Sequence, residues 1–129
     1  DNIKRDYLQW YEADPDRLNA EIERVKNDYP EFRTIKMEDA RISFSGKIEE
    51  SLVCVICEYL YPYQPPKAVL LTDVTEHIAT LSSDNEIDYL SIGAMEWDAN
   101  TSSVSDVLKR IQVIIKLSTT KKQGTSPKK

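Results

Sequence analysis

The chain has 129 residues, of which 40% are hydrophobic and 30% charged, and its net charge is −5. This length suits one domain with one core, and the composition is typical of a folded chain rather than a disordered one. Net negative charge argues against a nucleic-acid partner, because non-specific affinity for phosphates comes from Lys and Arg. The longest apolar runs are much shorter than the ~20 residues of a membrane-spanning helix. We therefore expect no membrane span and, without an apolar leader, a cytoplasmic location in which membranes are reached only through partners.

Two helices are predicted before residue 30. Apolar residues between Ile3 and Tyr11 recur near helical spacing and indicate a first, amphipathic helix. Asp14 can then cap a second helix with Pro15 at its first position, where the missing N–H costs nothing. Pro30 ends this second helix, because its ring disfavours the helical conformation of the preceding residue. One stripe of apolar side chains predicts its buried face: Leu18, Ile22, Val25 and Tyr29.

A four-strand meander is predicted next. Weak strand patterns at 32–37 are followed by alternation of apolar and polar residues at 42–48. Residues 52–57 are apolar on both faces, as in a central strand covered on both sides. Prolines at three positions within 61–66 predict a stiff, extended connection to a fourth strand at 68–71.

The last third predicts an irregular segment, a helix and a tail. Residues 72–103 have no strong period, although Ile87 and Trp97 could anchor them to the core. Ser103 and Asp106 form a capping-box pattern ahead of a helix. Its expected inner face is Val104, Val107, Leu108, Ile111 and Ile115. A lysine-rich stretch with little to bury predicts a flexible basic tail or linker at 118–129, after a domain spanning 1–117.

The sequence contains few of the motifs that are typical of enzymes or metal sites. Cys54 and Cys57 have the spacing of a redox or zinc pair, but residues three apart in a strand point to opposite faces. We therefore interpret both as core cysteines. His77 lacks enough neighbouring ligands for zinc, and the acidic cluster at 84–88 lacks the glycine of a calcium loop, which favours a solvated turn. We predict no metal site and no cofactor.

Several residues together resemble the ubiquitin-conjugating-enzyme fold. They are Arg17-Leu18 with Glu21, the run Tyr61-Pro62-Tyr63-Gln64-Pro65-Pro66, Trp97, and Ile111-Gln112 in the final helix. The resemblance covers roughly residues 14–116. It implies an α+β fold in which a four-stranded antiparallel meander is packed by helices.

The chain departs from the catalytic members of that family. They carry a nucleophilic cysteine eight residues before the tryptophan, where this sequence has Tyr89, and a His-Pro-Asn motif where it has His77-Ile78-Ala79. A phenol with a pKa near ~10 is a poor substitute for a thiol that ionises near neutral pH. The sequence is most similar to the non-catalytic ubiquitin-conjugating-enzyme variants, the UEV domains, which lack the two C-terminal helices of active enzymes.

Among UEV domains the likeness is closest to the tumour-susceptibility-type UEV of ESCRT-I. It implies a non-catalytic domain that binds ubiquitin or a ubiquitin-like protein in cargo sorting, with other ESCRT-I subunits or a conjugating enzyme as further partners. Family members grip ubiquitin with a tongue between the first two strands and with the neighbouring sheet surface. The residues that this implies here are Lys36, Met37, Glu38, Asp39 and Arg41 in the tongue, and Ile56 and Val69 on the sheet.

Other interpretations stay open. The loop at 49–51 is short and holds no tyrosine, so the proline-rich-peptide groove of animal members is not expected. The chain could instead be a UEV scaffold that pairs with an active conjugating enzyme, or an RWD-like interaction module. A further alternative is an enzyme in which Tyr89 replaces a natural cysteine.

Overall fold

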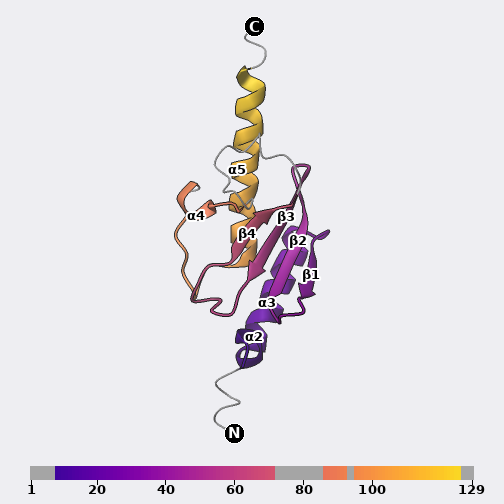
Figure 1. Ribbon diagram of the computed structural model, residues 1–129, viewed down its shortest axis with the longest axis vertical. Helices are drawn as coiled ribbons and strands as arrows, with labels where there is room; N and C mark the ends of the chain where they lie inside the picture. Colours follow the sequence, from indigo (N-terminus) through magenta and orange to yellow (C-terminus); the bar gives the residue numbers. More distant parts are fainter. Residues whose placement is uncertain (1–7, 72–85, 93–94, 126–129) are drawn as a thin grey trace.

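In its described residues the protein combines a four-stranded antiparallel sheet with helices, and is therefore α+β as predicted (Figure 1). The computed structural model describes residues 8–71, 86–92 and 95–125, with the backbone alone for 91, 92 and 118–125. The helices are α2 (Trp10–Ala13), α3 (Pro15–Asp28), α4 (Tyr89–Ile92) and α5 (Val104–Thr125). The strands are β1 (Arg33–Lys36), β2 (Ile42–Ile48), β3 (Ser51–Cys57) and β4 (Lys67–Leu70), adjacent in that order.

Helix α3 begins and ends where its local residues dictate. The side chain of Asp14 accepts a hydrogen bond from the Arg17 N–H at 3.3 Å, and Pro15 occupies the first turn. The helix ends at Asp28, two residues before Pro30, so the predicted cap and stop are both confirmed. Of the earlier predicted helix, the described residues contain α2, and residues 1–7 lie outside them.

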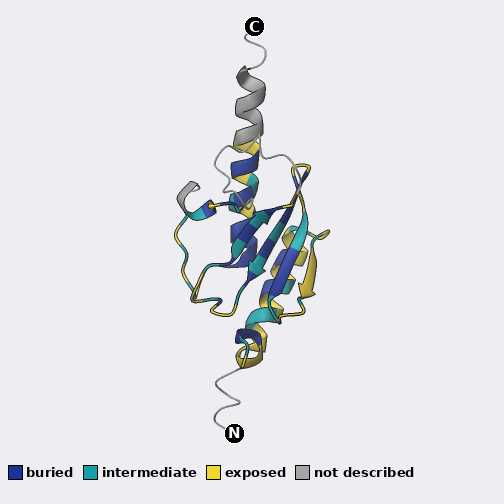
Figure 2. Ribbon diagram, in the orientation of Figure 1, coloured by how far each residue is buried: buried dark blue, intermediate teal, exposed yellow. Residues whose placement is uncertain are grey.

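Helix α3 and the first part of α5 lie behind the sheet in Figure 1 and cover the same face, which we call the inner face, while the rest of α5 extends beyond the sheet. The side chains of the inner face form the core with Val25 of α3 and the buried residues of α5 (Figure 2). In β3, Val53, Val55 and Cys57 are completely buried on this side. The prediction that residues 52–57 are covered on both sides is wrong for the described chain. Leu52 is 36% exposed and Cys54 and Ile56 are only half-buried, because no described helix packs on their side.

The proline-rich connection after β3 is folded rather than extended. The carbonyl of Leu60 accepts hydrogen bonds from the N–H groups of Tyr63 and Gln64, at 2.8 and 3.0 Å. The Tyr61–Pro62 peptide bond is cis. The ring of Tyr61 is buried between Trp10 and Trp97, with centroid distances of 4.8 and 5.7 Å. The prolines thus lie in a compact turn, which corrects the expectation of a straight spacer.

Helix α5 starts at the predicted capping box. The Ser103 N–H donates to Asp106 and the Asp106 N–H donates back to the Ser103 hydroxyl, at 3.0 and 3.2 Å. All of its predicted inner-face residues are buried: Val104, Val107, Leu108, Ile111 and Ile115. The helix continues through 118–125, where the composition predicts the start of a tail, while 126–129 lie outside the described residues. No helix in the described part of the chain is both long and apolar enough to cross a membrane.

Candidate functional site

Position 89, where the family resemblance would place a nucleophile, holds a buried tyrosine. Tyr89 is the first residue of α4 and is 3% exposed. Its hydroxyl donates to the carbonyl oxygen of Pro66 at 2.5 Å. Burial, together with the negative charges around it, raises the pKa of this phenol above its usual value. Tyr89 therefore joins α4 to the proline-rich connection and has no nucleophilic character near neutral pH.

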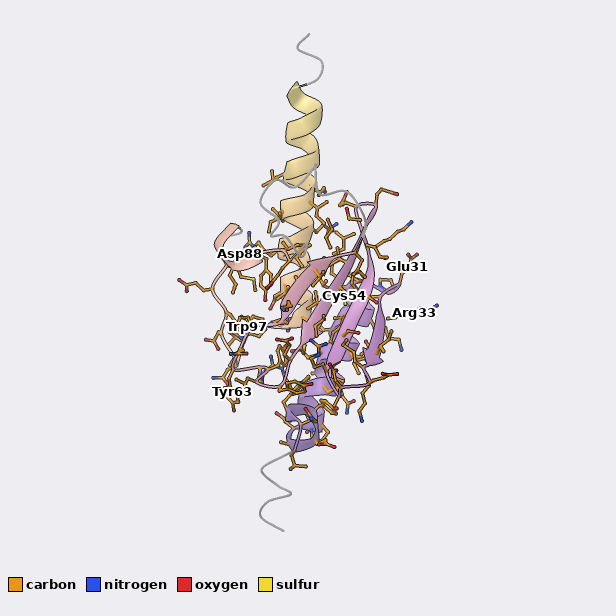
Figure 3. The ribbon with its side chains drawn as sticks, viewed as in Figure 1. Glu31, Arg33, Cys54, Tyr63, Asp88 and Trp97 are labelled. Atoms are coloured by element: carbon orange, nitrogen blue, oxygen red, sulfur yellow. The ribbon has the colours of Figure 1, made fainter. Side chains whose placement is uncertain are left out.

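An open cleft of about 480 Å³ lies beside Tyr89. Its walls come from the proline-rich connection, the start of β4 and residues 86–90, and its charged residues are Glu58, Lys67, Glu86 and Asp88. Asp88 and Trp97 lie on the side of the molecule away from the β1 edge (Figure 3). The described lining contains no thiol and no imidazole, which are the groups that acyl or thioester transfer uses most often. His77 and the first part of the acidic cluster, 84–85, lie outside the described residues.

The two cysteines point to opposite faces of β3, as predicted. Cys57 is buried on the inner face, where burial and the nearby Glu21 carboxylate raise the pKa of its thiol well above the usual value. Cys54 is on the other face, near the centre of the sheet in Figure 3, and is only half-buried, so the core-cysteine interpretation is confirmed for Cys57 and wrong for Cys54. Burial raises the pKa of the Cys54 thiol, against smaller lowering effects of the Arg41 charge and a hydrogen bond with Ser43. Neither thiol is an activated nucleophile. The described residues also contain no group of three or more His, Cys, Asp or Glu able to hold a metal ion.

A buried polar cluster, formed by Arg17, Glu21 and Tyr61, ties α3 to distant segments. The Arg17 Nε donates to Glu21 Oε2 at 2.8 Å, and the Tyr61 hydroxyl donates to the same oxygen. The other carboxylate oxygen of Glu21 accepts the Val104 N–H at 2.9 Å, at the start of α5. The remaining guanidinium nitrogens of Arg17 donate to the carbonyls of Ala99 and Ser102, at 2.7 and 2.9 Å. The cluster is architectural, because it satisfies its own donors and acceptors inside the protein.

The side of the sheet that no described helix covers carries the predicted sheet residues, and we call it the outer face. Cross-strand pairing places Ile35, Ser43, Ile56 and Lys67 in one row, and Arg33, Ser45, Cys54 and Val69 in the next. Lys47 and Leu52 form a third row, which Leu71 extends because its N–H donates to the Leu52 carbonyl at 2.7 Å. Ile35, Leu52 and Leu71 are 49, 36 and 53% exposed. Ser43 and Ser45 lie between β1 and the apolar residues of β3 and β4, so the outer face mixes apolar, hydroxyl and basic side chains.

The predicted tongue, 36–41, is a tight hairpin turn at one end of this face. The Met37 N–H donates to the Arg41 carbonyl at 2.8 Å, and the Ala40 N–H donates to the Met37 carbonyl at 2.9 Å. Ala40 has φ 74°, a left-handed conformation that glycine adopts more easily. The turn is held on both sides, since Tyr11 and Tyr59 donate their hydroxyls to the carbonyls of Ala40 and Asp39, at 2.9 and 2.8 Å.

Charges also hold the tongue in place. The Arg41 guanidinium binds Asp39 at 2.9 Å and Glu58 at 2.8 Å, and so joins the turn to the end of β3. These carboxylates are 47 and 38% exposed, so water screens both ion pairs. Lys36 and Glu38 are exposed, whereas Met37 is half-buried. The tongue therefore presents a fixed shape with mixed charge.

The structure places Ile56 and Val69 on the outer face next to the tongue, but not Lys36, which pairs with the buried Ile42 and whose Nζ lies 5.5 Å from the centroid of the Tyr11 ring. The tongue adjoins the row that contains Ile56, and Val69 lies in the next row, beside Cys54. Sequence reasoning did not identify Ile35, Leu52 and Leu71, which are the most exposed apolar side chains on the outer face. The sequence does show alternation within β3. The strand register, which only the structure provides, then places Ile35 on the same side of the sheet as Ile56.

Comparisons with known proteins identify no relative of this chain. No family model matches the chain, and neither does any curated protein or solved structure. The geometry of the outer face, the tongue and position 89 is therefore what bears on function.

Proposed function

We propose that this chain is a non-catalytic, UEV-like domain of the ubiquitin-conjugating-enzyme fold that binds ubiquitin or a ubiquitin-like protein. The observation that carries the proposal is the outer face, where the exposed Ile35 and the half-buried Ile56 lie in the row beside the tongue. Exposed apolar patches rimmed by polar groups mark protein-interaction sites. A role in an ESCRT-I-like subunit is the narrower form of this proposal and rests on the sequence resemblance.

The element order supports the fold part of the proposal. The chain has a helix, then a four-strand meander with a Tyr-Pro turn between β3 and β4 that packs against a tryptophan, and then a closing helix, as the resemblance implies. The Trp97 Nε1–H donates to the Pro62 carbonyl at 2.7 Å, which links the two motifs that carry the resemblance. Arg17, Glu21 and Tyr61, which the resemblance also includes, meet in one buried cluster.

The burial of Tyr89 supports the non-catalytic part. A conjugating enzyme needs a thiol that is accessible to a bulky partner and partly ionised. Position 89 is enclosed, and the raised pKa values of both cysteine thiols leave neither of them suited to that task.

Titration of the isotope-labelled chain with ubiquitin tests the proposal. We expect amide shifts in 36–41, 52–57 and 67–70 in fast exchange, because a contact below ~1,200 Å² in total is typical of transient recognition. Shifts that are absent at the highest soluble ubiquitin concentration, or confined to α5, would reject the outer face as the site.

A matched pair of variants separates binding from folding. Ile35→Asp places a charge on the outer face at a residue that is 49% exposed, and Val113→Asp does the same on α5 at a residue that is 44% exposed. We expect Ile35→Asp to weaken ubiquitin binding about tenfold or more, whereas Val113→Asp binds like the parent protein. If ubiquitin fails but an active conjugating enzyme produces shifts on this chain, the scaffold alternative gains support instead.

A further inference from the structure

The outer edge of β1 is a second candidate for recognition, distinct from the outer face. β1 is the terminal strand of the sheet, and within the described ranges no segment pairs with its far side. All four of its residues are exposed. An unpaired strand edge is a template for another strand, and proteins use it to bind extended peptides.

The register shows which backbone groups are available. The hydrogen bond from the Met37 N–H to the Arg41 carbonyl marks that pair as a bonded pair of the β1–β2 ladder. Bonded and non-bonded pairs alternate in antiparallel sheets, so Ile35 and Arg33 direct their backbone groups toward β2. Thr34 and Lys36 then direct their N–H and C=O groups outward, away from the sheet.

A hollow lies directly beside this edge. It measures about 230 Å³ and is lined by Ile22, Val25 and Lys26 of α3 and by Phe32 and Thr34. A cavity of about 150 Å³ lined by apolar groups can hold a benzene molecule, so this hollow has room for one large aliphatic or aromatic side chain. Alternate side chains of a strand added to β1 would point to the inner side, toward α3 and the hollow.

The hollow is held open by a specific contact. The ring of Phe32 lies over Gly46, where a Cβ atom would approach its Cδ1 to 2.4 Å. Phe32 also packs against Tyr29, with ring centroids 5.5 Å apart. The absence of a side chain at Gly46 therefore lets Phe32 settle onto β2 and form the floor between the sheet edge and α3.

Charge indicates the chemistry of the occupant. Lys26, Arg33 and Lys36 are exposed around the edge and the hollow, in a chain whose net charge is −5. Glu31, near Arg33 in Figure 3, offsets part of this local charge. The same basic groups would repel the edge of a second copy, which argues against self-pairing. An acidic segment would be attracted instead.

We propose that the β1 edge binds an extended peptide segment of a partner protein, which adds a strand to the sheet. One bulky apolar side chain of the peptide enters the hollow beside Phe32, and flanking Asp or Glu residues meet Lys26, Arg33 and Lys36. This site uses the edge and the inner side of β1, and it shares Arg33 with the outer face and Lys36 with the tongue. It does not depend on the ubiquitin-binding proposal.

Selection of displayed random linear peptides against the full chain tests this inference. The Thr34→Pro variant serves as counter-selection, because it removes one outward N–H and leaves the bonds to β2 in place. Proline is tolerated at such solvent-facing edge positions. We expect enriched peptides with an apolar residue between acidic ones, and amide exchange protected at Thr34 and Lys36 when a selected peptide is bound. We also expect affinity reduced about tenfold or more in Thr34→Pro.

A charge-reversal pair guards against a folding defect in the proline variant. Lys26→Glu alters the rim of the hollow, whereas Lys47→Glu makes the same change on the outer face. We expect Lys26→Glu to lower the affinity for the selected peptides several-fold at low salt. Lys47→Glu should leave that affinity within about twofold of the parent value. Selection that yields no peptides sensitive to Thr34→Pro and Lys26→Glu, or peptides that protect other amides, would overturn the inference.

Discussion

Arg17 and Arg41 each bind a carboxylate at 2.8 Å, but their surroundings differ. Glu21, the partner of Arg17, is 2% exposed, whereas Glu58, a partner of Arg41, is 38% exposed. The first pair holds α3, the proline-rich connection and the start of α5 together. The second holds one hairpin turn against the end of β3. The same chemistry thus fixes the architecture in one region and shapes a surface in the other.

The two ion pairs contribute differently to stability because one carboxylate is buried and the other is exposed to water. A buried carboxylate has lost its hydration and depends on its protein partners, so removal of a partner leaves unsatisfied groups. An exposed carboxylate regains water when its partner is removed, and the net loss is small. Three tests can break or sharpen the comparison.

The largest effect is expected for Glu21→Leu. This change removes the acceptor for the Tyr61 hydroxyl and the Val104 N–H and leaves the Arg17 guanidinium without its carboxylate. We expect a loss of about 3–5 kcal/mol in the free energy of unfolding, as for other broken buried pairs. Denaturant unfolding followed by circular dichroism measures it.

Glu23→Leu is the matched control for that measurement, because Glu23 is an exposed glutamate of the same helix. Its stability should stay within about 0.5 kcal/mol of the parent. The double variant Arg17→Met/Glu21→Leu should lose less free energy of unfolding than the two single variants together, because removing both side chains leaves no unpaired buried charge. A cost below about 1 kcal/mol for Glu21→Leu would contradict the architectural role of the cluster.

Local patterns predicted α3 and the start of α5 well, but they missed α4, and of the first predicted helix only the single turn of α2 is helical among the described residues. Long-range contacts explain what local patterns missed in the core. Asp14 with Pro15, and Ser103 with Asp106, are caps whose bonds span three residues, so sequence alone reveals them. The buried cluster joins Arg17 to Tyr61 and to Ser102 across 44 and 85 positions. A periodic sequence pattern cannot predict contacts between such distant residues. A glutamate is also expected at the surface unless its buried partners are known.

The candidate site was predictable in part for a related reason. The tongue and Ile56 follow from the resemblance and from strand alternation, but the exposure of the outer face does not. Apolar residues on both sides of 52–57 suggested cover on both sides, and a strand's own residues cannot specify whether a helix is there to cover them. β1 gave a weak signal because all of its residues are exposed, which leaves no contrast between its two faces.

A smaller effect on stability is expected for Arg41→Ala. Both of its ion pairs are exposed, so the free energy of unfolding should fall by less than about 1 kcal/mol. The tongue should nevertheless loosen, because Arg41 joins it to Glu58. We expect faster amide exchange at Met37, measured by NMR, while Lys47→Ala leaves that rate unchanged. A stability loss as large as that of Glu21→Leu would contradict this prediction, because it would show that Arg41 stabilises the fold as much as the buried cluster does.

The smallest effect concerns Asp28, whose contacts are intermediate between the two clusters. It accepts a hydrogen bond from the buried Ser105 hydroxyl and pairs with Lys109 at 3.2 Å. The Ser105 bond, followed by the contact with Lys109, lowers the pKa of the Asp28 carboxyl below its usual 3.8. Because the folded pKa is depressed, the stabilisation is complete above the usual value and is lost as pH falls through the lower one. Asp28→Asn should therefore be less stable than the parent at neutral pH, and the two unfolding free energies should converge in acid only below the depressed pKa of the folded state. Ser105→Ala should remove most of this pH dependence, whereas a pH-independent difference would show that the carboxylate's charge has no part in the contact.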